Sequence, residues 1–98
     1  MAMRQGENKV QISVLHLSEE EKRNFGIYHW PVSTIEASLF AWHHEKKEEC
    51  YILEGEVEVT TPDGKKVNFT AGDFVIFPKG ISCICHVKKS VRRHCHYT

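Results

Sequence analysis

The sequence predicts a single all-β domain, folded as a sandwich or a small barrel. Roughly eight short segments have the alternating or continuous apolar patterns of strands. Turn signals such as Thr61-Pro62-Asp63-Gly64 recur along the chain, and only one short helix is expected, near the N-terminus. At 98 residues the chain is long enough for one compact core but not for two. We therefore expect one domain over residues 1–98.

The N-terminal third holds one strand and the helix. Residues 1–9 are polar and are expected to be flexible. Residues 10–17 alternate between apolar and polar side chains and predict the first strand. Residues 18–21, Ser-Glu-Glu-Glu, predict a helix start, because a hydroxyl caps the free N–H groups and carboxylates favour the positive end of the dipole. Residues 24–26 end the helix, and a short apolar segment follows at 27–30.

The central strand is expected to start at Glu48. Residues 50–53 are continuously apolar, which is typical of a strand buried on both faces. Gly55 interrupts the pattern where a bend or bulge needs a residue without Cβ. Residues 56–59 alternate Glu-Val-Glu-Val, the pattern of a strand with one wet face. Further strands are expected at 35–42, 66–69, 74–77, 81–87 and 91–97.

Composition excludes several functional classes. Lys plus Arg and Asp plus Glu are balanced at 13 each, so there is no basic field to attract nucleic acid. No apolar run approaches the roughly 20 residues of a membrane helix. The first residues lack the apolar core of a secretory signal, so we expect a cytoplasmic protein.

The four cysteines are expected to be reduced. Three of the four, Cys50, Cys83, Cys85 and Cys95, lie in strand-like segments, and no two of them form a Cys-x-x-Cys pair. That spacing argues against a zinc knuckle or a redox dithiol. Free cysteine packs as a small hydrophobe, which suits buried strands.

Two segments resemble the sequence motifs of the cupins. Residues 48–55 are similar to the end of the first motif, with its glutamate and glycine, and residues 72–80 to the Gly-Pro-Gly part of the second. Residues 40–42 and 91–94 extend the similarity to small single-domain cupins grouped with ureidoglycine aminohydrolase-like proteins. The resemblance covers about residues 28–97. It implies a double-stranded β-helix, or jelly roll of the RmlC-like type, with one short helix.

The resemblance also implies a divalent metal. Cupins generally hold one with two histidines and a glutamate from the first motif and a histidine from the second. Glu48 and His44 match two of these positions, while Trp42 and Cys83 occupy the other two. A metal set of His44, Glu48 and Cys83 would favour zinc or iron over magnesium or calcium, with nickel or manganese as further candidates. Without a metal, Glu48 is the candidate catalytic base.

Other interpretations stay open at this point. His44 could be a solvated turn residue, and Cys83 a core thiol. Glu48 could pair with Arg92 or Arg93, since a buried carboxylate needs a partner.

Side-chain alternation predicts a shared pocket. If Glu48 faces the lumen, so does Cys50, and if Cys83 does, so does Cys85. The set expected to converge in one pocket is Trp42, His44, Glu48, Cys50, Cys83 and Cys85. Tyr51 and Trp42 are expected as aromatic walls for a small-molecule ligand.

The C-terminal strand carries two further patterns. His94 and His96 share a face and could bind zinc or nickel adventitiously. The Lys88-Lys89 and Arg92-Arg93 pairs are expected to form a solvated sheet edge, where charge discourages edge pairing.

Three functions remain in competition. The first is a metal-dependent hydrolase or isomerase acting on a small polar, nitrogen-rich or sugar-like molecule. The second is a non-catalytic module that binds such a molecule in a degenerate metal site. The third is an assembly role as a homodimer.

Overall fold

The computed structural model describes residues 11–98. The elements are β1 (Ser13–Leu15), α1 (Glu19–Phe25), the short 3-10 helix η2 (Ile27–His29), β2 (Val32–Ile35), β3 (Ser38–His43), β4 (Glu48–Thr60), β5 (Lys66–Thr70), β6 (Phe74–Phe77) and β7 (Ser82–Tyr97). The predicted all-β class with one short helix is confirmed. The expected flexibility of residues 1–9 concerns a segment outside the described residues.

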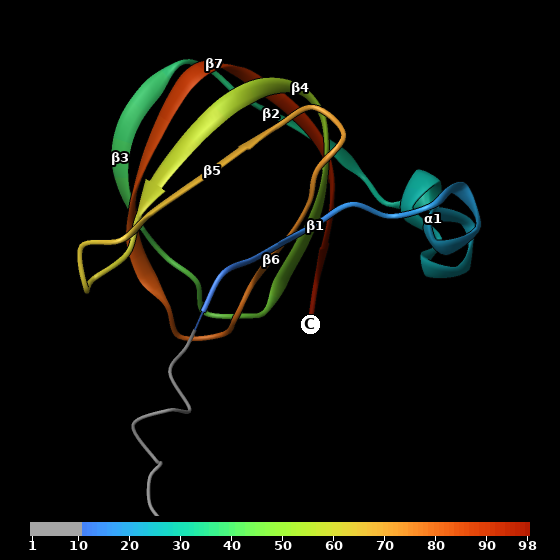
Figure 1. Ribbon diagram of the computed structural model, residues 1–98, viewed down its shortest axis with the longest axis horizontal. Coiled ribbons are helices and arrows are strands. Elements are labelled where there is room, and N and C mark those ends of the chain that lie inside the picture. Colours follow the sequence, from blue (N-terminus) through green and yellow to red (C-terminus); the bar gives the residue numbers. More distant parts are fainter. Residues whose placement is uncertain (1–10) are drawn as a thin grey trace, which may run out of the picture.

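All strand pairs are antiparallel and join into one sheet. The sheet runs in the order β1-β6-β4-β7-β2, with β3 added to β7 and β5 added to β4. It curls around a central lumen, and α1 lies outside this roll at one end (Figure 1). Strand β7 is therefore central, which differs from the solvated edge expected for its charged residues.

Strands β4 and β7 pair along most of their length and carry the core. Side chains alternate, so that Cys50 and Val59 of β4 and Cys85 and Val91 of β7 point into the lumen and are buried. The segments 81–87 and 91–97, predicted as two strands, form the single strand β7 because no turn interrupts them.

Gly55 allows the two long strands to come together. Its φ is +111°, and the β4–β7 register shifts around it. A Cβ at this position would lie 2.7 Å from the Cα of Val91 and would also collide with the carbonyl oxygen of Ser90. The predicted bulge residue is thus a glycine for two reasons, its backbone angle and the close approach of β7.

The helix begins and ends where the sequence predicted. Ser18 and Glu21 form a reciprocal capping box, and Gly26 ends the helix in the left-handed conformation with φ of +71°. Phe25 stacks on the outward-facing Phe74 with ring centres 5.3 Å apart. This contact fixes the helix against the outer face of the roll.

Two sequence predictions of strand extent were inaccurate. The expected strand 10–17 is limited among the described residues to β1, three residues long. Strand β2 follows Pro31 with the sequence Val-Ser-Thr-Ile, and its mixed polarity gave no clear strand signal; pairing with β7 makes it a strand.

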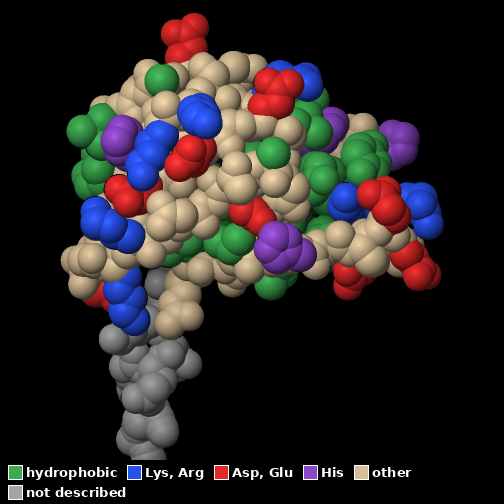
Figure 2. Space-filling view, turned by 45° about the horizontal axis from the view of Figure 1, so that its top comes forward, with side chains coloured by type: hydrophobic (Ala, Val, Ile, Leu, Met, Phe, Trp, Pro, Cys, Tyr) green, Lys and Arg blue, Asp and Glu red, His purple; other side chains and the backbone are tan. Residues whose placement is uncertain are grey.

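Opposite charges are interspersed on the face shown in Figure 2. Arg92 pairs with Glu54 at 3.3 Å, and Lys88 and Lys66 both approach Glu58. Among the described residues, no helix is long and apolar enough to cross a membrane.

Candidate functional site

Glu48 is a fully buried carboxylate at the start of β4. The strand places it opposite Phe77 of β6 and Tyr97 of β7, and its exposed fraction is 0%. A charged group in this position is stable only if it is paired and hydrogen-bonded. Its partners therefore define the chemistry of the lumen.

One carboxylate oxygen, Oε2, is satisfied by several donors. Nη1 of Arg93 lies 2.9 Å away, the Tyr97 hydroxyl donates at 3.2 Å and the Cys50 thiol donates at 3.1 Å. Burial alone would raise the pKa of Glu48, but His44 and Arg93 outweigh it and lower the pKa. Glu48 is therefore ionised and paired with the guanidinium, one of the alternatives that the sequence left open.

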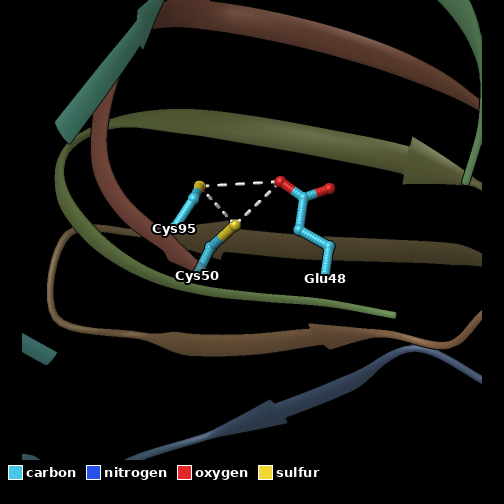
Figure 3. Close-up of side chains that lie close together, drawn as sticks. All are labelled: Glu48, Cys50 and Cys95. Atoms are coloured by element: carbon cyan, nitrogen blue, oxygen red, sulfur yellow. Dashed lines mark hydrogen bonds between the residues drawn. The ribbon is translucent and has the colours of Figure 1, made fainter. Parts of the chain in front are cut away.

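Two thiols share this carboxylate oxygen. Cys50 and Cys95 face each other in register on β4 and β7, with Sγ atoms 2.8 Å apart, and Cys95 lies 3.5 Å from Oε2 of Glu48 (Figure 3). The ligand atoms of these three residues lie within 4.8 Å of one another, a spacing that could hold a metal. Burial, reinforced by Cys95, raises the pKa of Cys50, so its thiol is neutral.

The second carboxylate oxygen faces His44. This imidazole is 3% exposed and stacks between Trp42 and Phe77, with ring centres at 4.4 and 4.5 Å. Its Nε2 lies 3.0 Å from Oε1 of Glu48. The ring is not aimed for a hydrogen bond, and neither ring nitrogen nor Oε1 has a hydrogen-bond partner among the described residues. These three buried atoms make no hydrogen bond within the described residues, although Nε2 and Oε1 lie at ion-pair distance from each other.

His44 and Cys83 hold a charge pair beside the carboxylate. Burial lowers the pKa of His44, but Cys83 and Glu48 raise it more, to about 9. Hydrogen bonding from Cys85, 4.0 Å away, together with His44 lowers the pKa of Cys83 to about 5 against the effect of burial. The raised pKa of His44 and the lowered pKa of Cys83 both favour the charged forms of these two groups.

This pair predicts how stability depends on pH. The contribution of Cys83 to stability is complete above its ordinary pKa of 9.0 and is lost progressively as the pH falls toward 5. The contribution of His44 to folding stability is complete below pH 6.5 and is lost as the pH rises through 9. Between pH 6.5 and 9 the gain from Cys83 and the loss from His44 therefore cancel. From pH 6.5 to 5, urea denaturation should show the wild type losing about 2 kcal/mol more than Cys83→Ser. Equal losses would contradict the charge assignment.

The structure brings most of the predicted site residues to the lumen. Trp42, His44, Glu48 and Cys50 form a continuous set of contacts, and Cys83 and Cys85 lie on the inward face of β7. Tyr51 does not join them. It lies on the outer face of β4, where its hydroxyl accepts a hydrogen bond from Lys22 at 3.1 Å. Alternation from Glu48 and Cys50 already assigns Tyr51 to that face.

Arg93 is the functional residue that the solvated-edge prediction misplaced. Its exposed fraction is 6%, because β7 is central and Val91, Arg93 and Cys95 share the inward face. The apolar residues Val91 and Cys95, two positions away on either side, were the sequence signal that Arg93 faces inward. Arg92, on the opposite face, is solvent-exposed as expected.

His94 and His96 share the outer face of β7, where both contact Trp30. Nδ1 of His94 lies 2.9 Å from the carbonyl oxygen of Trp30, and His96 stacks on the indole at 5.0 Å. Packing thus occupies both rings, and adventitious metal binding there stays a prediction.

Two surface grooves flank the turn between β4 and β5. One, of about 370 Å³, is lined by Trp42 and Cys83 together with the exposed His43 and Ser82, whose Nδ1 and Oγ are 2.8 Å apart. The other, of about 450 Å³, is lined by none of the predicted site residues. Inside the roll, the cavity next to Arg93 is only about 20 Å³, room for about one water molecule.

An antiparallel sheet rolled around a lumen with a buried carboxylate is the architecture of the cupins. A family model described as EutQ-like cupin domain matches residues 23–95. The chain therefore belongs to the EutQ-like cupin family. No protein of curated function has a significantly similar sequence.

Several solved structures share the fold. A DUF861 family protein from Thermotoga maritima is 40% identical, with 90% of this chain and 100% of that chain covered and a TM-score of 0.87. The EutQ protein of Clostridium difficile is 18% identical over 97% of this chain and 73% of that chain, with a TM-score of 0.62. A putative ethanolamine utilization protein Q from Salmonella typhimurium is 23% identical over 88% of this chain and 68% of that chain, with a TM-score of 0.59. The cupin prediction is confirmed, and the narrower ureidoglycine aminohydrolase-like group stays a prediction.

The residues present do not fit the usual metal set of cupins. Trp42 offers no ligand atom at a position that would carry histidine. Among the described residues, the compact group of candidate ligands is Glu48, Cys50 and Cys95, and not the expected His44, Glu48 and Cys83. The guanidinium of Arg93 lies against that compact group.

Proposed function

We propose that this cupin binds a small polar molecule in the groove beside Trp42, with a degenerate metal site beneath it. The observation that carries the proposal is the link between groove and lumen. Trp42 and Cys83 line the groove and both adjoin His44, whose ring nitrogens make no hydrogen bond within the described residues. A ligand with hydrogen-bond donors and acceptors would complete this arrangement.

The filled lumen favours the groove as the binding place. A cavity of about 20 Å³ cannot hold a metabolite, whereas a groove of about 370 Å³ falls in the range of small-molecule sites. Trp42 lines this groove, and the exposed Ser82 and His43 contribute polar groups to it. The resemblance to ureidoglycine aminohydrolase-like cupins supports a nitrogen-rich ligand, such as a ureido acid.

The metal-dependent hydrolase or isomerase is the less supported function, because Arg93 holds the position of positive charge beside Glu48. Stoichiometric metal in untagged protein, lost in Glu48→Gln, would favour it instead. Homodimer formation and a cytoplasmic location stay predictions, and light scattering of the purified chain checks the former.

Single-tryptophan variants test the binding groove. The chain has two tryptophans, so Trp30→Phe leaves Trp42 as the only reporter and Trp42→Phe leaves Trp30. We expect N-carbamoylglycine to change the fluorescence of Trp30→Phe saturably, with a dissociation constant of about 1 mM or tighter. Trp30 lies on the outer face, stacked on His96, and should not respond. The absence of a saturable change in Trp30→Phe, or a response confined to Trp42→Phe, would count against this groove for ureido acids.

A further inference from the structure

One nitrogen of Arg93 contacts two of the three candidate metal ligands in the lumen. Nη1 lies 2.9 Å from Oε2 of Glu48 and 3.3 Å from Sγ of Cys50. Sγ of Cys95 completes the group, 2.8 Å from Cys50 and 3.5 Å from the same carboxylate oxygen. The positively charged nitrogen is therefore bound by atoms of the kind that coordinate zinc in proteins.

The guanidinium is also held from its other sides. Nε donates to Oγ of Ser33 at 3.3 Å, and Cζ lies 5.2 Å from the ring centre of Trp42, a cation–π distance. The side chain is only 8% exposed. These contacts come from β2, β3 and β4, so the cation sits in a site built by three other strands.

We propose that Arg93 is the permanent cation of this lumen and fills the position that a metal ion would take among Glu48, Cys50 and Cys95. A divalent ion placed beside the guanidinium would be repelled by it while competing for the same carboxylate oxygen. Zinc binding would also release thiol protons to solvent, whereas beside Arg93 the Cys50 thiol donates a hydrogen bond to Glu48. The inference holds whether or not the groove binds a ureido acid.

Removing the arginine charge should expose a latent thiolate metal site. Arg93→Met keeps a stem of similar shape and leaves the carboxylate and both thiols in place. Reduced, untagged Arg93→Met should take up about one Co²⁺ per chain, with the absorbance of Co²⁺–thiolate bonds. It should bind Co²⁺ at least about tenfold more tightly than the wild type, which should lack those bands. Zn²⁺ should raise the melting temperature of Arg93→Met but not that of the wild type.

Arg92→Met is the matched control. It removes a neighbouring charge from the outer face, where Arg92 pairs with Glu54, and it retains His94 and His96. Any binding by those surface histidines is therefore equal in both variants and carries no thiolate absorbance. Adding Cys50→Ser to Arg93→Met should abolish the bands.

Three results would overturn the proposal. The first is wild-type protein that binds Co²⁺ through thiolates as tightly as Arg93→Met. The second is a folded Arg93→Met that takes up no Co²⁺. The third is an Arg93→Met chain that stays unfolded even when it is refolded with Zn²⁺, because the metal should then replace the missing charge.

Discussion

Replacing Glu48 by glutamine is expected to lower the free energy of unfolding by about 3–5 kcal/mol, because it leaves the buried guanidinium of Arg93 without its counter-charge. Arg93 is 6% exposed and cannot reach solvent without giving up its contacts with Ser33 and Trp42. Glutamine keeps the size and one hydrogen-bonding oxygen, so the loss reports the charge. Urea denaturation with an unchanged m-value would measure it.

Glu54→Gln is the control for this prediction. Glu54 pairs with Arg92 at 3.3 Å, but both side chains are about half exposed, so the loss should stay below about 1 kcal/mol. The double variant Glu48→Leu with Arg93→Met removes both buried charges and should recover most of the loss. Similar losses for Glu48→Gln and Glu54→Gln would show that the lumen pair does not carry the stability assigned to it.

Gly55→Ala should be comparably severe, with a loss of about 3 kcal/mol or more. The left-handed backbone costs a residue with Cβ about 1–2 kcal/mol, and the new methyl group would also press on backbone atoms of Ser90 and Val91, which cannot rotate away. The expected result is a large drop in melting temperature, measured by circular dichroism.

Gly64→Ala separates the two causes. Gly64 has φ of +85°, but no atom lies within 4 Å of where its Cβ would be, so only the backbone term applies and the loss should be about 1 kcal/mol. If the two alanine variants lost equal stability, the close approach of β4 and β7 at Gly55 would have no energetic role.

The sequence predicted most of the fold because its local signals agree with one another. The Ser18 cap, the Gly26 helix end and the bulge at Gly55 are short-range features, and each is visible from residue type and spacing. The inward direction of Glu48 and Cys50 follows from alternation in the same way. Strand order is a long-range property, and it is what the sequence could not supply.

The site was only partly predictable because the contacts within it depend on strand order. Arg93 was offered as a partner of Glu48 and also assigned to a solvated edge, and only the central position of β7 decides between them. The contact of Cys95 with Cys50 likewise depends on the β4–β7 register, since the residues are 45 positions apart. Tyr51 is different, because alternation alone was enough to place it outside.

The long unbroken strand β7 makes out-of-register pairing unstable in this small protein. If β7 paired one position out of step, Arg93 would leave the lumen and a neighbouring side chain would take its place. Glu48 would then lose the guanidinium that pairs with its Oε2. The same error would turn Cys83 away from the groove. A chain with this register error therefore has no stable core, so we expect it to unfold and refold to the native pairing.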